Sequence, residues 1–225
     1  MFGLFGSSKQ KWETTDVSTP TKPHEYEDVR KNVLNTVLEW TNSDDGWTPF
    51  SIVDNVTLES KVVDNSGITA TRGTLTFEGS DFNRFVDNLF ESSDESKKKI
   101  FEDMEANTVV KNLDHNNMVV HSQFRAPPTI YWREFVVLKS RTVLSDGRHV
   151  ITAISINDET VPHSKGYVRG VVISGMIVTP PKKDDNMIKI VKVEHVNPKG
   201  WLPVSLINMM KGKVGKTLAR MTVYL

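Results

Sequence analysis

The chain has 225 residues, of which 38% are apolar and 25% charged, as is typical of a soluble globular domain with a full core. It contains no cysteine, which excludes disulfides, thiolate metal sites and cysteine nucleophiles and is compatible with a reducing compartment. Because no apolar run approaches the roughly 18 residues of a membrane span, and Met1–Gly6 is too short for a signal-peptide core, we expect a cytoplasmic protein.

The net charge is zero, but the charges are divided along the chain. Residues 1–112 hold 20 acidic and 12 basic residues, whereas residues 113–225 hold 8 acidic and 16 basic residues. A basic C-terminal half suits an anionic surface such as phospholipid head groups, or the charges simply intermix once the chain folds. A nucleic-acid site needs aromatic residues among the bases, and the last helix offers only Trp201 and Tyr224, so we expect no nucleic-acid partner.

The first half of the chain predicts a tail, a helix, three strands and two short helices. Residues 1–23 are rich in Ser, Thr, Lys and Pro without periodicity, which indicates a flexible tail before one domain at 24–225. Residues 25–41 predict a helix because Val29, Val33, Val37 and Trp40 share one face. Strands are expected at 47–53, 56–63 and 67–77, and helices at 81–90 and 95–106. Lys97-Lys98-Lys99 indicates a solvated helix end.

The second half predicts six strands separated by hairpin turns. They are expected at 108–113, 118–125, 131–144, 148–156, 167–179 and 188–196. Turn residues such as Asn116 and Asp146-Gly147 separate several of them. Nine strands with hairpin spacing indicate one curved, mostly antiparallel sheet.

A long amphipathic helix closes the chain, from Pro203 to Leu225. Its apolar residues recur about every four positions, and Pro203 suits the first turn, where a missing N–H costs nothing. We expect this helix to cover the concave face of the sheet, giving an α+β fold. A sheet of this size folded around one helix tends to leave a cavity, and such cavities commonly hold an apolar ligand.

Several motifs resemble those of one family. The strand segment from Trp132 to Lys139 resembles the Arg-Asp-Phe-Val-x-x-Arg strand of START domains, the lipid-transfer modules related to the steroidogenic acute regulatory protein. The segments Tyr167–Gly170 and Ser174-Gly175 follow in the family's order. The segment from Val196 to Pro203 resembles the family's Asp-x-Lys-Gly-Trp-Leu-Pro approach to the last helix, and the resemblance is specific over residues 107–215.

The resemblance implies a helix-grip fold, in which a U-shaped sheet grips the C-terminal helix around a tunnel for one lipid. It also implies binding of a sterol, a phospholipid or a similar lipid without covalent chemistry, so we expect no enzyme activity and no cofactor. The C-terminal helix and adjacent loops are expected to act as a lid. Burying a lipid is favourable by about 0.8 kcal/mol for each CH₂ group.

The candidate lipid-binding residues come from strands and from the last helix. On the strand 131–144, period two places Arg133, Phe135, Val137 and Lys139 on one face. The resemblance adds Gln123, at the place of an acid in one phosphatidylcholine-carrying branch, and Ser155. The apolar face of the last helix adds Leu202, Leu206, Met209 and Met210.

Two of these residues have alternative roles. Lys139 either pairs with a lipid phosphate, in the absence of the family's carboxylate, or stands exposed at a strand end. Arg133 either points into the cavity or donates to backbone carbonyls near the Pro127-Pro128 loop. That loop also carries Ile130 and Tyr131, which we expect to touch a membrane together with Lys213 and Lys216 of the helix.

The sequence therefore predicts a monomer that binds one lipid and touches membranes transiently as a peripheral protein. Two rivals remain. One is a lipid-sensing module whose ligand controls a protein partner, and the other is an enzyme that uses the same cavity. The enzyme is disfavoured because no acid–base set assembles: the six histidines are scattered, and Ser155 and Ser174 have no evident base.

Overall fold

The computed structural model describes residues 23–63, 67–91 and 93–224. The tail predicted for residues 1–23 lies outside this range except for Pro23. The helices of the first half are α1 (Pro23–Asn42), α2 (Phe82–Phe90) and α3 (Asp94–Ile100). The strands are β1 (Thr48–Val53), β2 (Val56–Val62), β3 (Thr69–Glu78), β4 (Met104–Asp114), β5 (Asn117–Phe124), β6 (Trp132–Val143), β7 (His149–Ser155), β8 (Tyr167–Arg169), β9 (Val171–Thr179) and β10 (Met187–Asn197).

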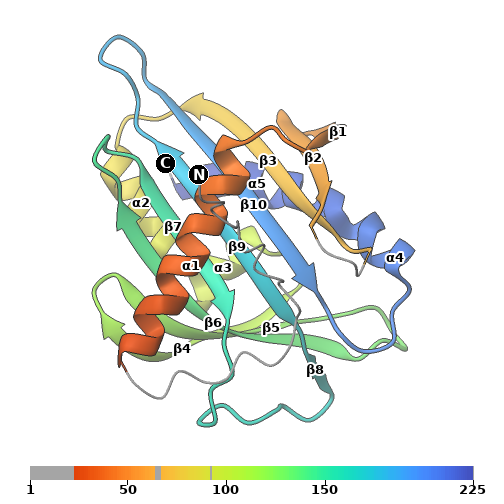
Figure 1. Ribbon diagram of the computed structural model, residues 1–225. Coiled ribbons are helices and arrows are strands. Elements are labelled where there is room, and N and C mark those ends of the chain that lie inside the picture. Colours follow the sequence, from red (N-terminus) through yellow and green to blue (C-terminus); the bar gives the residue numbers. More distant parts are fainter. Residues whose placement is uncertain (1–22, 64–66, 92, 225) are drawn as a thin grey trace, which may run out of the picture.

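The strands form one sheet, which confirms the predicted α+β fold with a sheet around a C-terminal helix (Figure 1). The strand order is β1-β2-β3-β10-β9-β7-β6-β5-β4, and all of these pairs are antiparallel. The tenth strand arises because the strand predicted at 167–179 is divided at Gly170, and β8 turns away to pair with β6 in parallel. Glycine at position 170 lets the backbone pass close to the Phe135 ring at this division, because a Cβ atom there would lie only 2.5 Å from that ring.

The helix predicted at 95–106 is too long. The structure ends α3 at Ile100, and Phe101 is already extended, with φ −103° and ψ 106°. Met104 then begins β4 and faces Phe124 of β5. The backbone groups of this segment therefore find their partners in β5, and strand pairing overrides the helical pattern of its apolar side chains.

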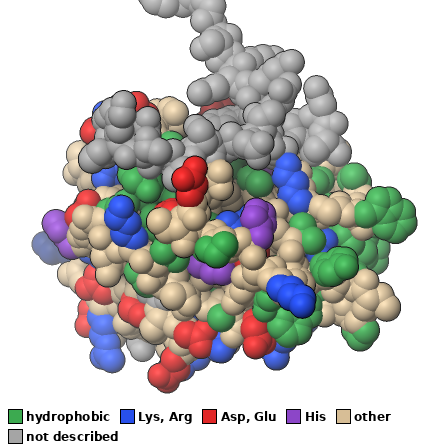
Figure 2. All heavy atoms as spheres, turned by 90° about the horizontal axis from the view of Figure 1, so that it is seen from below, with side chains coloured by type: hydrophobic (Ala, Val, Ile, Leu, Met, Phe, Trp, Pro, Cys, Tyr) green, Lys and Arg blue, Asp and Glu red, His purple; other side chains and the backbone are tan. Residues whose placement is uncertain are grey.

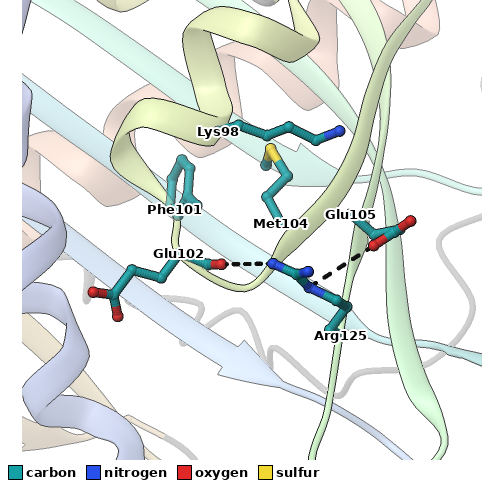
Figure 3. Close-up of a pocket in the computed structure, with 6 residues that line it drawn as sticks. All are labelled: Lys98, Phe101, Glu102, Met104, Glu105 and Arg125. Carbon is teal, nitrogen blue, oxygen red and sulfur yellow. Dashed lines mark hydrogen bonds and ion pairs between the residues drawn. The ribbon is translucent and has the colours of Figure 1, made fainter.

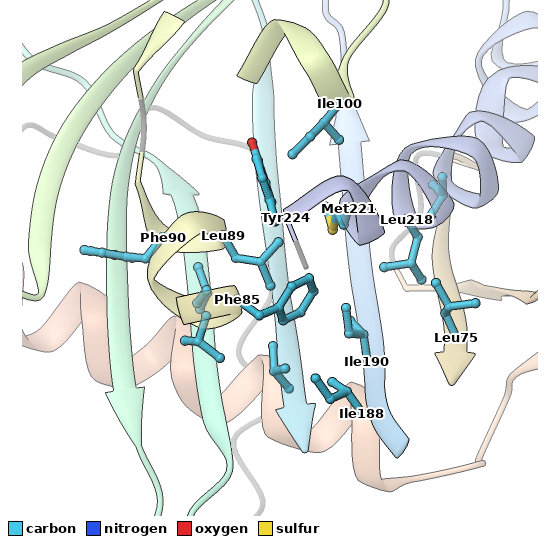
Figure 4. Close-up of a cluster of buried hydrophobic side chains, with 14 of the residues drawn as sticks. Leu75, Phe85, Leu89, Phe90, Ile100, Ile188, Ile190, Leu218, Met221 and Tyr224 are labelled. Carbon is cyan, nitrogen blue, oxygen red and sulfur yellow. The ribbon is translucent and has the colours of Figure 1, made fainter. Parts of the chain in front are cut away.

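The two faces of the sheet carry separate cores. Helix α1 crosses the outer face, where Val33, Val37 and Trp40 pack on strand residues such as Val136 and Leu138 (Figure 1). Helices α2 and α3 and the end of the chain lie on the opposite, concave face. There, Phe85 and Leu89 of α2 pack with Leu218 and Tyr224 (Figure 4).

The C-terminal helix, predicted as one rod, is interrupted. It consists of α4 (Val204–Met209), a 3₁₀ turn η1 (Met210–Gly212), α5 (Lys213–Arg220) and a second 3₁₀ turn η2 (Met221–Tyr224). Helix α5 buries Val214, Gly215 and Leu218, whereas α4 and η1 bury none of their residues. The two halves of the predicted rod therefore pack very differently on the sheet.

Candidate functional site

The part of the concave face that α5 does not cover remains accessible. Strand residues alternate between the two faces, so those in phase with buried core residues point inward. Several of these inward side chains are only half-buried, although they belong to central strands: Phe135, Ala153, Val172, Met176 and Val196. Part of the apolar concave surface therefore stays accessible to solvent.

The predicted strand residues divide between the two faces. Phe135 and Val137 point inward, and Ser155 lies beside Val137 with its Oγ accepting from the backbone N–H of Val172 at 2.9 Å. Gln123 faces Glu134 on the outer side and donates to Ser164 Oγ at 3.0 Å. Gln123 is therefore separated from the concave face by the sheet itself.

Arg133 connects two loops at one end of the sheet. Its Nε donates to the carbonyl of Pro198 at 2.8 Å, Nη2 to that of Lys199 at 3.1 Å, and Nη1 to that of Tyr131. Burial lowers the pKa of this guanidinium. The bonds to backbone carbonyls agree with the structural alternative, but two of them lie in the segment before α4 and not near Pro127-Pro128.

Lys139 lies at the C-terminus of α2. Its Nζ donates to the carbonyls of Phe90 at 2.6 Å and Leu89 at 3.2 Å, where the helix dipole favours a cation. Lys97 reaches the same end, donating to Leu89 at 3.2 Å and Asn88 at 3.3 Å. The pattern predicted a solvated Lys97, but it is 6% exposed because α3 folds back on α2.

Burial lowers the pKa of both lysines. Removal from water lowers the pKa of Lys97 to about 8, against a smaller opposing effect of Glu91. Burial, followed by repulsion from Lys97, lowers the pKa of Lys139 well below its usual range. The site therefore disfavours the charged form of both lysines, and the carboxylate of Glu91 opposes this effect only in part.

The predicted residues of the last helix lie at its exposed half. Leu202 and Leu206 are half-buried, whereas Met210 is 45% and Met209 79% exposed. A 3₁₀ turn has about three residues per turn, so η1 rotates the apolar stripe away from the sheet before α5 resumes it. In this arrangement Met209 and Met210 face outward.

The predicted membrane contacts differ in exposure. Tyr131 is 67% exposed and Ile130 half-buried. Lys216 is exposed, while Nζ of Lys213 is 2.9 Å from an Asp103 carboxylate oxygen in the α3–β4 connection. Trp201, which the prediction did not include, is 94% exposed and lies two residues beyond a carbonyl that Arg133 binds.

A pocket of about 240 Å³ opens beside the α3–β4 connection (Figure 3). Its lining residues are Lys98, Phe101, Glu102, Met104, Glu105 and Arg125. Phe101 packs edge-on against Phe124 at 5.9 Å between ring centroids, and Phe124 against Phe135 at 5.8 Å. This row of aromatic rings leads from the pocket to the accessible concave surface.

Two charged residues on the concave face were missed by the sequence reasoning. Lys192 and Glu194 of β10 are in phase with the buried Ile188 and Ile190, and therefore point inward. Lys192 is 4% exposed at its side chain and donates to Glu194, which is 25% exposed. The signal was present in the sequence, because period two places both charges on the apolar face of this strand.

The comparisons give a consistent picture. The family model described as "START domain" matches residues 87–223, which is more than half of the chain. None of the curated proteins matches.

Among the described residues, no helix is long and apolar enough to cross a membrane, and no three His, Asp or Glu side chains gather as metal ligands.

Solved structures share the fold at low sequence identity. Human StAR-related lipid transfer protein 5 is 16% identical with a TM-score of 0.77, over 89% of this chain and 96% of that chain. Human STARD10 is 18% identical with a TM-score of 0.73, over 93% and 81%. The lipid transfer and protein localization domain of human StarD13 is 19% identical with a TM-score of 0.68, over 90% and 97%. With the match of the family model, these results show that the chain belongs to the START domain family.

Proposed function

We propose that the chain binds one lipid between the concave face of the sheet and the C-terminal helix, and carries it between membranes. START domains bind lipids, so membership in the family supports the general function. The observation that carries the finer proposal is the division of the last helix. Helix α5 is anchored in the core, whereas α4 and η1 bury no residue above a partly accessible apolar surface.

The contacts of α4 and η1 suit a cover that opens. Asn208 accepts from the backbone N–H of Thr69 at 3.1 Å and donates to the carbonyl of Gly67 at 3.0 Å. Lys211 donates to Ser60 Oγ at 3.2 Å and lies over the Phe50 ring. Such bonds each contribute only about 0.5–1.5 kcal/mol net, so α4 and η1 can detach without unfolding α5.

Exposed apolar side chains around this cover support a membrane-docking role. Tyr131 and Trp201 belong to the two loops that Arg133 joins, and Val204 is 40% exposed at the start of α4. Apolar side chains gather on the right of Figure 2, the side on which Figure 1 shows α4. Aromatic rings favour the membrane interface, and Lys213 and Lys216 would meet anionic head groups during a transient, peripheral contact.

A disulfide across the cover tests the proposal. The chain has no cysteine, and Asn208 of α4 is hydrogen-bonded to Thr69 of β3, so Thr69→Cys with Asn208→Cys introduces a single pair of neighbouring thiols as a reversible lock. Vesicles that carry a fluorescent phospholipid or a fluorescent sterol would report transfer to unlabelled vesicles. We expect oxidation to slow transfer at least tenfold and a reductant to restore it.

The two single-cysteine variants are the controls, because they carry the same substitutions without the lock. Equal transfer by the oxidised and reduced double variant would exclude α4 as the lid. Lipid that is retained by the protein but never exchanged, even by the reduced form, would favour a lipid-sensing module over a carrier.

A further inference from the structure

The charged pair on β10 belongs to a polar band that crosses the concave face. In register, Glu194 lies opposite Thr71 of β3 on one side and opposite Ser174 of β9 on the other. Thr71 in turn lies opposite Ser60 of β2, whose Oγ accepts from Lys211 of η1. Residues directly opposite in antiparallel strands have Cβ atoms about 5 Å apart. Four adjacent strands thus contribute one polar row, which we call the polar band: Ser60, Thr71, Glu194 and Ser174, with Lys192 beside it.

The polar band separates two apolar regions. On one side, Leu58 and Ile190 belong to the core beneath α5 and are inaccessible to solvent. On the other side, Val172 and Val196 are half-buried and belong to the accessible surface. A chain of CH₂ groups placed along Val172 and Val196 would therefore meet the polar band, and Met176, opposite Lys192, is a half-buried apolar residue beyond it.

Burying the Lys192–Glu194 ion pair removes charged groups from water, which costs free energy of folding. Lys192 is buried, which lowers the pKa of its ammonium to about 7. Ion pairs in such surroundings often stabilise a fold no more than apolar residues of the same size do. Charged groups whose protonation is perturbed by burial and a charged neighbour are found at functional sites more often than elsewhere. Glu194, at 25% exposure, keeps the pair within reach from the accessible side.

We propose that Lys192 and Glu194 hold the polar end of a neutral, hydroxyl-bearing lipid. This inference rests on the proposed function and names the ligand class. A hydroxyl group donates one hydrogen bond and accepts others, so it can donate to the Glu194 carboxylate and accept from the Lys192 ammonium. The ammonium has three N–H groups, and Glu194 is its partner among the described residues.

An anionic head group fits this position poorly. It would compete with Glu194 for Lys192 and would place a second negative charge beside the carboxylate, where low polarity strengthens the repulsion. The lysines that would compensate an anion, Lys97 and Lys139, instead hold the C-terminal carbonyls of α2. The structure thus favours a hydroxyl lipid over the phospholipid that Lys139 suggested from the sequence.

Lipids that differ only in the hydroxyl group provide the test. Purified protein would extract cholesterol or dioleoylglycerol from phosphatidylcholine vesicles, in competition with the methyl ether of the same lipid, and native mass spectrometry would count each complex. We expect at least a tenfold preference for the free hydroxyl in one of the two pairs, because a site built to bond a hydroxyl rejects the analogue without it. Lys192→Met with Glu194→Leu should bind both members equally.

Two further variants make the result decisive. Lys189→Met changes a lysine on the exposed side of the same strand and should keep the preference. Glu194→Gln preserves size and should reduce the preference even if the double variant does not fold. Three results would overturn this inference but leave the proposed function standing. The natural chain could bind the free hydroxyl and the methyl ether equally, it could bind phosphatidic acid more tightly than either hydroxyl lipid, or Glu194→Gln could keep the preference unchanged. Failure to bind any lipid, phosphatidylcholine included, would overturn the proposed function as well.

Discussion

Gly215 of α5 packs so closely against Val53 of β1 that a Cβ atom on the glycine would lie 2.8 Å from the Cβ atom of the valine. A Cβ atom on Gly212, by contrast, would have no atom within 4 Å. The two glycines of the last helix therefore have different roles. Gly215 permits close packing of the anchored half, and Gly212 lies where the helix tightens into a 3₁₀ turn.

Alanine at the two positions should act in opposite directions. Gly215→Ala overpacks α5 against β1 and should cost about 1–3 kcal/mol of the free energy of unfolding. Gly212→Ala should stabilise the helix by up to about 1 kcal/mol and slow lipid transfer, because it makes the cover harder to bend. Urea unfolding measures the first effect and vesicle-to-vesicle transfer the second. Equal destabilisation by both substitutions would contradict these assignments.

Arg133 should be required for the attachment of the loop before α4. Arg133→Met leaves the carbonyls of Tyr131, Pro198 and Lys199 without this donor, and bonds to charged groups are each worth about 1.5–3 kcal/mol. Arg133→Lys should recover only part of the loss, since an ammonium lacks the planar fork of a guanidinium. We expect the order natural chain, Arg133→Lys, Arg133→Met in urea unfolding. A stable Arg133→Met variant with unchanged midpoint would show that these bonds add nothing.

Trp201 should contribute to membrane association. Its side chain is 94% exposed, so Trp201→Ala should leave the free energy of unfolding within about 0.5 kcal/mol of the natural value. Cosedimentation with phosphatidylserine-containing vesicles should fall several-fold, because the interface loses a favoured aromatic anchor. Val143→Ala is the matched control, as Val143 is 58% exposed at the opposite end of β6 from Arg133. An equal loss of cosedimentation in Trp201→Ala and Val143→Ala would show that Trp201 contributes no more to membrane association than another exposed apolar side chain.

Lys97 should make stability depend on pH in the alkaline range. The pKa of Lys97 falls from 10.5 to about 8 in the folded chain, so between these values the unfolded chain binds more protons. The free energy of unfolding should therefore rise with pH over this window, by up to about 1.4 kcal/mol per pH unit. Below pH 8 both states are protonated and this contribution to the slope vanishes.

Comparison with Lys97→Met isolates that slope from the titration of other groups. The variant should lose the rise between about pH 8 and pH 10.5 in urea unfolding, while Lys98→Met, which changes an exposed lysine, should keep it. Parallel curves for the natural chain and Lys97→Met would show that burial does not perturb this ammonium.

The sequence by itself determined the fold class of this protein and most of its elements, although it extended the helix at 95–106 over the start of β4. Alternation with period two marked the strands, and apolar residues about every four positions marked α1 and the last helix, because these periods follow from backbone geometry. The same alternation assigned Phe135 and Val137 to one face of β6, which the structure confirms. The motif around Trp201 was distinctive enough to indicate the START family.

Only the tertiary structure decided what the charged side chains contact. Lys139 binds the end of α2, Arg133 binds carbonyls more than sixty residues further along the chain, and Gln123 faces away from the concave side. Each of these outcomes depends on which distant segment arrives beside a strand, and local periodicity carries no information on that. The break at Gly212 likewise follows from packing, since α5 is held by the core and α4 is not. A sequence pattern specifies which face a side chain occupies, but long-range pairing specifies what lies opposite that face.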